Sequence, residues 1–507
     1  MSHWPVYKLM PLRKALPPSV TTKLSNSFHN IMSKVVEPYE AAAPKILTKY
    51  PGPKALAFNE SMSQTIANSD QLREVINLEN SFGNYFEDVD GNVVLDMFMD
   101  NGRNAFGYNS RRWIKETKLQ KYDKFLYQRP AIGVLPPAEY PKLLHELLMK
   151  VGPDAISEVY LSCGCGSSAN LNAFKFAFLK KFFDLKGTDK ITAEEERSIL
   201  IGQQPGAPKF SILGFEGGYH GKFLDELSLS QYNTNNSIAS HNWPIAPFPK
   251  LKLPYEDNCA FNRAEETRCV EETAKLIKQH KDSLAAMIIE PLQLTGGVRY
   301  ASNMFYKDLV DLCYDNDIAF ICDETNTSGW AGGRPFMHAN WNLEKPAHFV
   351  TFGGRMQLAG FFYQKQFRPK HGNMISSTWN GDIAKLMQFF DTYDQITRVD
   401  WIDAHTEQFW QGCKAELLDL QRKAKIPISN IRGIGKIFAF DVEHTLLRDE
   451  IIHLSRENGF KVAPNGSTSI AFTPSLLFTE VHLARYKDFF EKLTPSTLNG
   501  HHFNNKV

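Results

Sequence analysis

The sequence predicts an α/β fold in which a mostly parallel β-sheet is covered by helices on both faces. Short hydrophobic segments with strand character alternate along the chain with segments whose apolar residues recur at helical spacing. Such alternation favours parallel pairing, because each crossover helix returns the chain to the same end of the sheet. Several predicted strands end in glycines or acidic residues, and open sheets of this class bind ligands at those ends.

The elements follow in order along the chain. A β-hairpin is predicted over residues 83–98, where apolar residues alternate around an Asp-Gly turn. Residues 158–183 indicate a strand, a glycine-rich loop and then a helix that we expect to begin near Asn170. Residues 209–222 indicate another strand that runs into a glycine-rich loop.

The second half continues the alternation. We expect buried strands at residues 284–293, 318–324 and 348–352, with a helix at residues 304–317. The first of these strands ends at Glu290 and the second at Asp323. From residue 392 onward, helices with short strands indicate a separate α+β domain.

Composition excludes several classes of protein. The chain has 507 residues, of which 43% are hydrophobic and 22% charged, which is typical of a globular protein of two or three domains. Its net charge of +1 does not favour nucleic-acid binding. No apolar run approaches the roughly 20 residues of a membrane-spanning helix. The seven scattered cysteines do not form a disulfide framework, which favours a reducing compartment.

The two termini differ from the body of the chain. Residues 1–36 contain no acidic residue but carry five basic ones, which are Lys8, Arg13, Lys14, Lys23 and Lys34. This composition is typical of a mitochondrial transit segment, and a basic docking arm is the alternative. His501 and His502 near the other end suggest a metal site, but no third ligand lies nearby, so we expect a flexible tail.

Three features could hold an anionic, flat cofactor. Gly166 and Ser167 precede a helix, whose free N–H groups and dipole suit a phosphate. Asp323 ends a buried strand, and a buried carboxylate needs a partner, for which a pyridinium nitrogen is suitable. Tyr219 and His220 could lay a ring against the cofactor. Taken singly, each has a plainer explanation as a turn, a cap or a loop aromatic.

Together, these features resemble a known family. The segments "GNYFEDVDGN", "RPAIGVLPP", "NWPIAPFPKLK", "IIEP", "ICDE", "FRP" and "STWNGD" are similar to those of the mitochondrial-type 4-aminobutyrate aminotransferases. These are class III members of the fold-type-I pyridoxal-phosphate enzymes. The resemblance runs from about residue 50 to about residue 492. It implies a large domain with a mostly parallel seven-stranded sheet flanked by helices, a smaller α+β domain, and a homodimer with sites at the subunit interface.

The resemblance also implies a role for individual residues. Gly166 and Ser167 would hold the cofactor phosphate, and Tyr219 would stack on the pyridine ring where the family usually has Phe. Asp323 would pair with the ring nitrogen, and Glu290 matches a family carboxylate at its strand end. Thr378 would reach the phosphate from the neighbouring subunit.

The chain departs from the family at the residue that carries the chemistry. The family's Ser-Lys-Lys turn, whose first lysine forms the Schiff base, here reads Gly353-Gly354-Arg355. Gly354 therefore stands at the lysine position. Arg355 cannot replace the amine, because its guanidinium stays protonated. Both the covalent anchor and the general base are lost.

Further positions depart as well. Lys222 stands where the family has the arginine that receives the substrate carboxylate, and it lacks the bidentate fork. Thr295 and Thr473 replace a Glu–Arg pair, so neither charge is left stranded. Cys165 keeps one ligand position of the iron–sulfur cluster of the animal enzymes, but Ser168 replaces the second, so we expect no cluster.

These departures predict a catalytically inactive homologue that acts as an accessory subunit of a mitochondrial assembly, for example a respiratory-chain complex. Its location would be the matrix or the matrix side of the inner membrane. We expect no covalent cofactor, although pyridoxal or pyridoxamine phosphate could bind non-covalently. The alternatives are a transaminase with a relocated lysine, such as Lys222, and a non-catalytic binder of cofactor or amino acid. The predicted domains are residues 1–45 (a basic extension), 46–120 (the first part of the small domain), 121–391 (the large domain) and 392–507 (the C-terminal domain).

Overall fold

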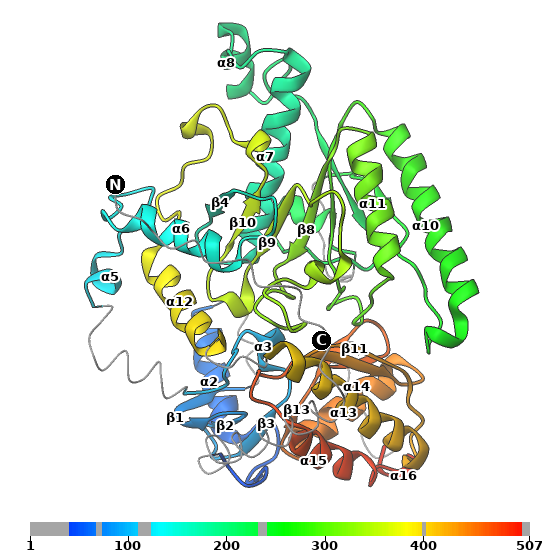
Figure 1. Ribbon diagram of the computed structural model, residues 1–507. Coiled ribbons are helices and arrows are strands. Elements are labelled where there is room, and N and C mark those ends of the chain that lie inside the picture. The colour runs from blue at the N-terminus through cyan, green and yellow to red at the C-terminus, as the bar shows by residue number, and fades with distance from the viewer. Residues whose placement is uncertain (1–39, 67–73, 110–122, 232–240, 398–401, 499–507) are drawn as a thin grey trace, which may run out of the picture.

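A seven-stranded sheet forms the centre of the larger part of the computed structural model, which describes residues 40–66, 74–109, 123–231, 241–397 and 402–498 (Figure 1). The strand order is β4-β10-β9-β8-β7-β5-β6. The strands β5 to β9 pair in parallel, whereas β10 runs antiparallel to both β9 and β4. The predicted fold class and the seven-stranded sheet are thus confirmed. The strands are β4 (Glu158–Leu161), β5 (Ser211–Phe215), β6 (Ile245–Ala246), β7 (Leu284–Ile289), β8 (Ala319–Glu324), β9 (Phe349–Phe352) and β10 (Gly360–Tyr363).

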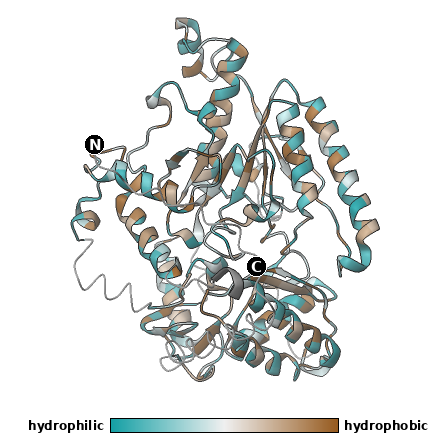
Figure 2. Ribbon diagram, in the orientation of Figure 1, coloured by the Kyte–Doolittle hydropathy of each residue, from teal (hydrophilic) through white to brown (hydrophobic). Residues whose placement is uncertain are grey.

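Helices cover both faces of this sheet. Because successive strand residues point to opposite faces, Ala286 and Ile288 of β7 pack in the cluster that contains helix α7 (Gly166–Lys186). Met287 and Ile289 pack in the cluster on the opposite face, which contains residues of α10 (Cys259–Gln279) and α11 (Asn303–Asp315). The colouring in Figure 2 agrees, because the strands are brown and these outer helices are banded teal and brown.

Two four-stranded sheets form the smaller part of the molecule. One has the order β1-β2-β3-β13 and the other the order β11-β12-β15-β14. The predicted hairpin is confirmed as β2 and β3, and β3 pairs in parallel with β13 from the far end of the chain. The strands are β1 (Ile76–Phe82), β2 (Tyr85–Asp88), β3 (Val93–Asp96), β11 (Ser429–Ile434), β12 (Ile437–Asp441), β13 (Phe460–Lys461), β14 (Ala463–Asn465) and β15 (Ser469–Phe472).

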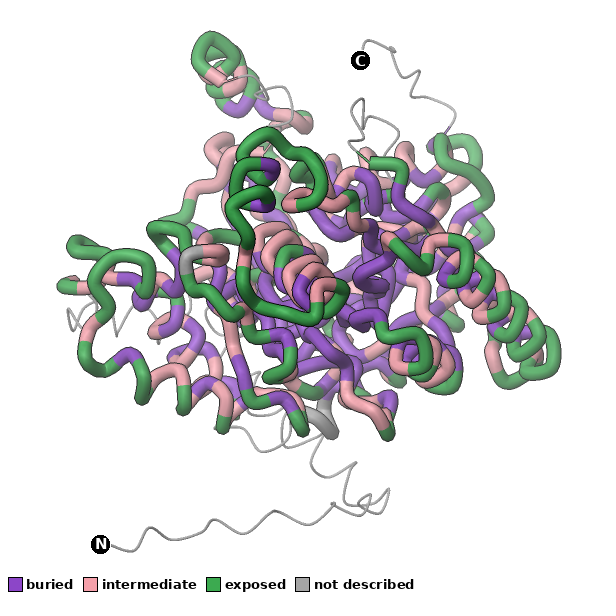
Figure 3. The backbone as a smooth tube through the Cα atoms, turned by 90° about the horizontal axis from the view of Figure 1, so that it is seen from above, coloured by how far each residue is buried: buried purple, intermediate pink, exposed green. Residues whose placement is uncertain are grey.

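The remaining helices surround these sheets, and the buried residues concentrate toward the middle of the molecule (Figure 3). Among the described residues, no helix is both long enough and apolar enough to cross a membrane. The remaining α-helices are α2 (Pro53–Ser63), α3 (Met99–Gly102), α5 (Asp123–Gln128), α6 (Tyr140–Val151), α8 (Ala193–Leu200), α9 (Leu224–Leu227), α12 (Ile383–Thr397), α13 (Ile402–Lys423), α14 (Thr445–Glu457), α15 (Glu480–Phe490) and α16 (Pro495–Leu498).

Two predicted boundaries were wrong. Helix α7 begins at Gly166, four residues before Asn170, because the extended Cys165 already ends the loop and Gly166 takes the first helical position. The strand in residues 284–293 was predicted to end at Glu290 and ends one residue earlier, at Ile289, since the next residues are Glu290 and Pro291 and proline has no N–H to donate to a ladder. The basic residues near the N-terminus and the two terminal histidines lie outside the described residues.

Candidate active site

A cavity of about 510 Å³ lies at the carboxyl ends of the central strands. Its lining includes the first turn of α7, the loop that follows β5, and residues that follow β8 and β9. Asp100 and Arg103, at the end of α3, add polar groups from the smaller part. This is the position where open α/β sheets bind ligands.

The start of α7 forms an anion cradle in this cavity. Gly166 and Ser167, both predicted to hold a phosphate, line the cavity. The Cys165 side chain makes no capping hydrogen bond, so the first N–H groups of the helix are not satisfied by their own cap. Free N–H groups and the helix dipole together favour a bound anion here.

Asp323 is enclosed by the chain's own hydrogen-bond donors. Its Oδ2 accepts from His220 Nδ1 at 2.7 Å and from Asn170 Nδ2 at 2.9 Å. Its Oδ1 accepts from the backbone N–H and the hydroxyl of Thr325, at 2.9 and 2.7 Å. Burial alone would raise the pKa of Asp323, but the hydrogen bond and charge of His220 outweigh that effect and lower the pKa. The carboxylate is 1% exposed and is not among the described residues that line the cavity.

Two further carboxyl groups are buried beside the cavity. Glu290 is 2% exposed and accepts a hydrogen bond from the backbone N–H of Tyr219, and burial holds its pKa well above the usual range. Glu226 is fully buried, and burial raises its pKa to about 9. Its carboxyl group contacts Ser167 of the anion cradle, so at neutral pH it is a neutral group there. The sequence analysis missed Glu226, because nothing in its local pattern indicates burial.

The turn after β9 has a conformation that suits glycine. Gly354 has φ +49° and lines the cavity. A Cβ atom at this position would lie 2.8 Å from the carbonyl oxygen of Thr325, so a side chain would require the backbone to shift. Gly353 packs against the start of α7, since a Cβ there would lie 3.2 Å from the Cα of Gly166. Glycine at residue 354 is therefore integrated into the local packing.

Arg355 is directed away from the cavity. Its side chain is 3% exposed and donates from Nε to the carbonyl oxygen of Gly102 at 2.7 Å and from Nη2 to that of Pro474 at 3.3 Å. Its Nη1 has no hydrogen-bond partner among the described residues. Burial lowers its pKa to about 10, so the guanidinium remains charged at neutral pH.

The other altered positions do not form a substrate pocket around the cavity. Lys222 is exposed and is not among the described residues that line it. Thr473 is fully buried, and its hydroxyl donates to the carbonyl oxygen of Phe98. The carbonyl oxygen of Thr295 accepts instead from the backbone N–H of Gly466. The two threonines thus satisfy different backbone groups.

The last predicted residues are Thr378 and the pair Cys165 and Ser168. Thr378 is exposed and lies near Gly133, outside the cavity lining of its own chain. Cys165 lines the cavity and is exposed. The hydroxyl of Ser168 donates to backbone carbonyl oxygens, including that of Cys165 at 2.7 Å.

The cavity also contains cationic residues that the sequence analysis missed. Arg103 lies at its edge, paired with Asp100 at 2.8 Å. Lys385, in the first turn of α12, also lines the cavity and donates to Gln388 Oε1 at 3.0 Å. Both come from helices far from the predicted motifs in sequence, so no local pattern could have assigned them.

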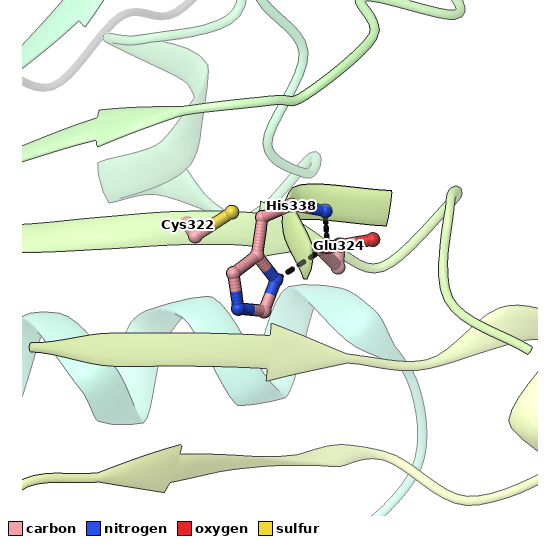
Figure 4. Close-up of side chains that lie close together, drawn as sticks. All are labelled: Cys322, Glu324 and His338. Carbon is pink, nitrogen blue, oxygen red and sulfur yellow. Dashed lines mark hydrogen bonds and ion pairs between the residues drawn. The ribbon is translucent and has the colours of Figure 1, made fainter. Parts of the chain in front are cut away.

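A second cluster near the sheet has side chains of the kind that bind metals. Cys322, Glu324 and His338 lie close together beside β8, as Figure 4 shows. Because successive strand residues point to opposite faces, Cys322 and Glu324 are on the other face from Asp323. However, Glu324 already accepts from His338 Nδ1 and from three other donors, which are the backbone N–H groups of Met337 and His338 and the hydroxyl of Thr327. Its lone pairs are occupied, so this carboxylate anchors the 3-10 helix η4 (Met337–Trp341).

Comparisons with known proteins agree with the fold. The family model described as aminotransferase class-III matches residues 66–494. The mitochondrial 4-aminobutyrate aminotransferase of Mus musculus is 34% identical over 463 residues, covering 90% of this chain and 92% of that protein. The 4-aminobutyrate aminotransferase of Dictyostelium discoideum is 32% identical, covering 90% and 92%.

Solved structures show the same fold. A lysine aminotransferase from M. tuberculosis, in its internal aldimine form, superposes with a TM-score of 0.75 at 20% identity and covers 88% of this chain and 99% of its own. A transaminase from the marine bacterium Virgibacillus has a TM-score of 0.70 at 14% identity, covering 87% of this chain and 99% of its own. With both the sequence model and the curated relatives spanning most of its length, the chain belongs to the class III aminotransferase family.

Proposed function

We propose that this chain is a catalytically inactive member of the family, retained as an accessory subunit of a mitochondrial assembly. The observation that carries the proposal is Gly354, which stands at the position expected for the Schiff-base lysine. Its left-handed backbone and the 2.8 Å approach of a Cβ to the Thr325 carbonyl oxygen leave little room for any side chain. Without an amine at this position, no side chain there can form the Schiff base with the cofactor or carry the proton during the reaction.

The residues present do not fit a covalently held pyridoxal phosphate. The anion cradle remains, but Asp323 is enclosed and its oxygens are occupied by His220, Asn170 and Thr325. A pyridinium nitrogen would have to displace one of these donors to reach it. The buried Glu226 also contacts Ser167 of the anion cradle, and because burial raises the pKa of Glu226 to about 9, this carboxyl group is neutral at neutral pH and leaves the cradle able to hold an anion.

A mitochondrial location is supported by the relatives, several of which carry that compartment in their names. The acid-free basic segment of residues 1–36 supports the same location. We propose the matrix or the matrix side of the inner membrane as the location. If the protein from a mild-detergent mitochondrial extract migrated on a native gel as a free dimer, the accessory role would be overturned, whereas comigration with a larger complex is the expected result.

A homodimer is part of the proposal. Exposed apolar side chains lie on and after α5 and in the segment just before α12. A backbone hydrogen bond joins these two segments, from the N–H of Ile132 to the carbonyl oxygen of Asn380 at 2.9 Å. Thr378 lies in the second of these segments, outside its own cavity, where it could reach a partner subunit. The apolar patch consists of Leu126, Tyr127, Ile132, Val134, Leu135 and Trp379. Exposed apolar clusters of this kind mark association surfaces.

We also propose that the described parts of the predicted domains at residues 46–120 and 392–507 form one small unit, whereas α12 crosses the predicted boundary between residues 391 and 392 and packs with the large sheet. The parallel pairing of β3 with β13 supports this, since it joins strands from both segments in one sheet. Residues 40–45 pack on the same unit, because Lys45 exchanges backbone hydrogen bonds with Val93.

The second candidate is a transaminase with a relocated lysine, and one observation favours testing it. Lys385 lines the cavity, whereas the lysine first considered, Lys222, does not. Intact-mass measurement after incubation with pyridoxal phosphate and borohydride decides between the two candidates. An inactive protein gives no site-specific adduct. A single adduct at Lys385 that is lost in Lys385→Ala, while Lys222→Ala keeps it, would establish the enzyme. Saturable pyridoxal-phosphate binding without an adduct would instead identify a non-covalent binder.

A further inference from the structure

A second cavity lies at the amino ends of the strands of the seven-stranded sheet, and the candidate active site lies at their carboxyl ends. Its volume is about 330 Å³, and it opens at the amino ends of β7, β8 and β9 between α7 and the end of α11. Its floor is made of buried small or apolar residues, among them Ala177, Ala285 and Ala319. This volume is in the range of small-molecule sites.

His348 supplies a hydrogen-bond donor with a fixed tautomer to this cavity. The backbone N–H of Phe320 donates to its Nδ1 at 2.9 Å, so the proton of the neutral ring is on Nε2. Burial and the nearby charge of Lys180 lower the pKa of His348 to about 4, which keeps the ring neutral at physiological pH. The residue is 5% exposed and lines the cavity, and its Nε2 has no hydrogen-bond partner among the described residues.

Lys181 adds a half-buried positive charge. Its Nζ donates to the carbonyl oxygen of Lys281 at 3.2 Å, and it forms no ion pair with a described residue. Burial lowers the pKa of Lys181, against the nearby charges of Asp317, Asp282 and Asp184, which raise it. Lys180 lines the same wall, but its charge is shared with Asp184.

The charges are distributed from the mouth to the floor of the cavity. The two acidic lining residues, Asp184 and Asp317, are exposed at the rim. Lys181 is half-buried and His348 is buried, and His348 stacks on Tyr314 with ring centroids 4.4 Å apart. A ligand with an anionic head and a flat apolar body matches this order of groups.

We propose that this cavity binds a small organic oxyanion, a carboxylate or a phosphate monoester, through Lys181 Nζ and His348 Nε2. The site is separate from the candidate active site, and it does not depend on whether the chain is an enzyme. Both donors would contact the same anion, so the removal of either one is expected to weaken binding.

The test uses benzoate as the probe in calorimetric titrations of the full chain, with neutral benzamide as the isosteric control. Benzoate is expected to bind one site per chain, and benzamide at least about tenfold more weakly. Lys181→Met keeps the apolar stem, and His348→Asn keeps an acceptor for the Phe320 N–H, while each removes one donor. Each variant is expected to weaken benzoate binding about tenfold.

The controls separate this cavity from the other anion cradle and from general charge effects. Lys175→Met removes an exposed lysine from the same helix, and Ser167→Ala alters the cradle at the carboxyl ends of the strands. Both are expected to bind benzoate as the unmodified chain does. The proposal is overturned if benzoate does not bind, if benzamide binds equally well, or if binding is lost in Ser167→Ala and kept in Lys181→Met and His348→Asn.

Discussion

The Arg355 guanidinium donates from Nε to the carbonyl oxygen of Gly102, 2.7 Å away. Arg355 lies between β9 and β10 of the seven-stranded sheet. Gly102 is the last residue of α3, which follows β3 of the smaller part. Gly102 has φ +74°, and a Cβ there would lie 2.1 Å from Arg355 Nη2, so the glycine makes the approach possible. Arg355 therefore serves packing between the two parts of the molecule.

Arg355→Ala should lower the free energy of unfolding by on the order of 3 kcal/mol. The substitution leaves two carbonyl oxygens without their donors and opens a buried cavity. Urea unfolding measures the change. Arg422→Ala is the matched control, because that side chain is 74% exposed and its ion pair with Asp419 is expected to contribute less than about 1 kcal/mol. Equal losses in the two variants would contradict the packing role.

Gly354→Ala should destabilise the fold by about 1–2 kcal/mol, the usual cost of a left-handed backbone for a residue with a Cβ, and more if the Thr325 carbonyl cannot move. Gly354→Lys should be at least as unstable and should form no Schiff base, because the turn does not direct a side chain into the cavity without strain. Thermal unfolding and borohydride trapping test both variants. Gly372→Ala serves as control, since a Cβ there meets nothing within 4 Å. A stable Gly354→Lys variant that traps the cofactor would refute this account.

The large sheet could be predicted from sequence because its signal is local. Buried strands such as β7 and β8 contain continuous apolar runs, and an acidic residue follows β7 directly and two acidic residues end β8. The alternation within a strand also explains why Asp323 and Glu324 face opposite sides, toward Asn170 and His338 respectively. What the alternation could not show is that Asp323 is closed off by donors from elsewhere in the chain.

The parts that were missed depend on distant segments. Lys385 and Arg103 reach the cavity from α12 and α3, and the burial of Glu226 depends on packing against Ser167. The start of α7 was placed four residues late because Gly166 and Ser167 have low helix propensity, which matters little in a first turn. Side-chain positions of this kind follow from tertiary packing and leave no trace in local periodicity.

Glu226→Gln should stabilise the protein increasingly as pH rises from about 4.5 to about 9. The folded state raises the pKa of this carboxyl group from 4.5 to about 9, so over that window the folded protein retains a proton that the unfolded chain releases. Unfolding is then favoured as pH rises, by up to a few kcal/mol. Glutamine has nearly the same shape and does not titrate. Urea midpoints at several pH values, compared between the two proteins, should diverge toward pH 9, and parallel curves would show that Glu226 ionises in the folded state.

Leu135→Arg should convert the proposed homodimer to a monomer. Leu135 is 80% exposed within the apolar patch, so a charge there adds desolvation cost to any interface that covers it. Light scattering after size exclusion gives the mass directly. Leu200→Arg is the matched control, because Leu200 is 85% exposed on α8, outside the patch, and should leave the mass unchanged. A dimer that persists in Leu135→Arg would place the interface elsewhere.

Lys436→Met should stabilise the protein, and most strongly at or below neutral pH. Lys436 is 1% exposed, and burial lowers its pKa from 10.5 to about 7. Its ammonium donates to the carbonyl oxygen of Phe478 at 2.8 Å and lies 3.4 Å from the ring centroid of Phe409, but it has no carboxylate partner among the described residues. Methionine fills a similar volume without a charge to desolvate, which replaces a buried uncompensated group by a packed apolar one.

The pH dependence gives the sign of this effect. Between about pH 7 and 10.5 the unfolded chain holds a proton on Lys436 that the folded protein has released, so the unmodified protein gains stability as pH rises through this window. The advantage of Lys436→Met should therefore be a few kcal/mol near pH 7 and should shrink toward pH 10. Lys461→Met provides the contrast, because that half-buried lysine pairs with Glu74 at 3.0 Å and its pKa is raised. It should destabilise the protein at neutral pH, since the buried Asp96 would lose its cation and Glu74 would keep only Arg456 as a cationic partner among the described residues. If both methionine variants changed stability in the same direction, pairing with a carboxylate would not be what separates the two lysines.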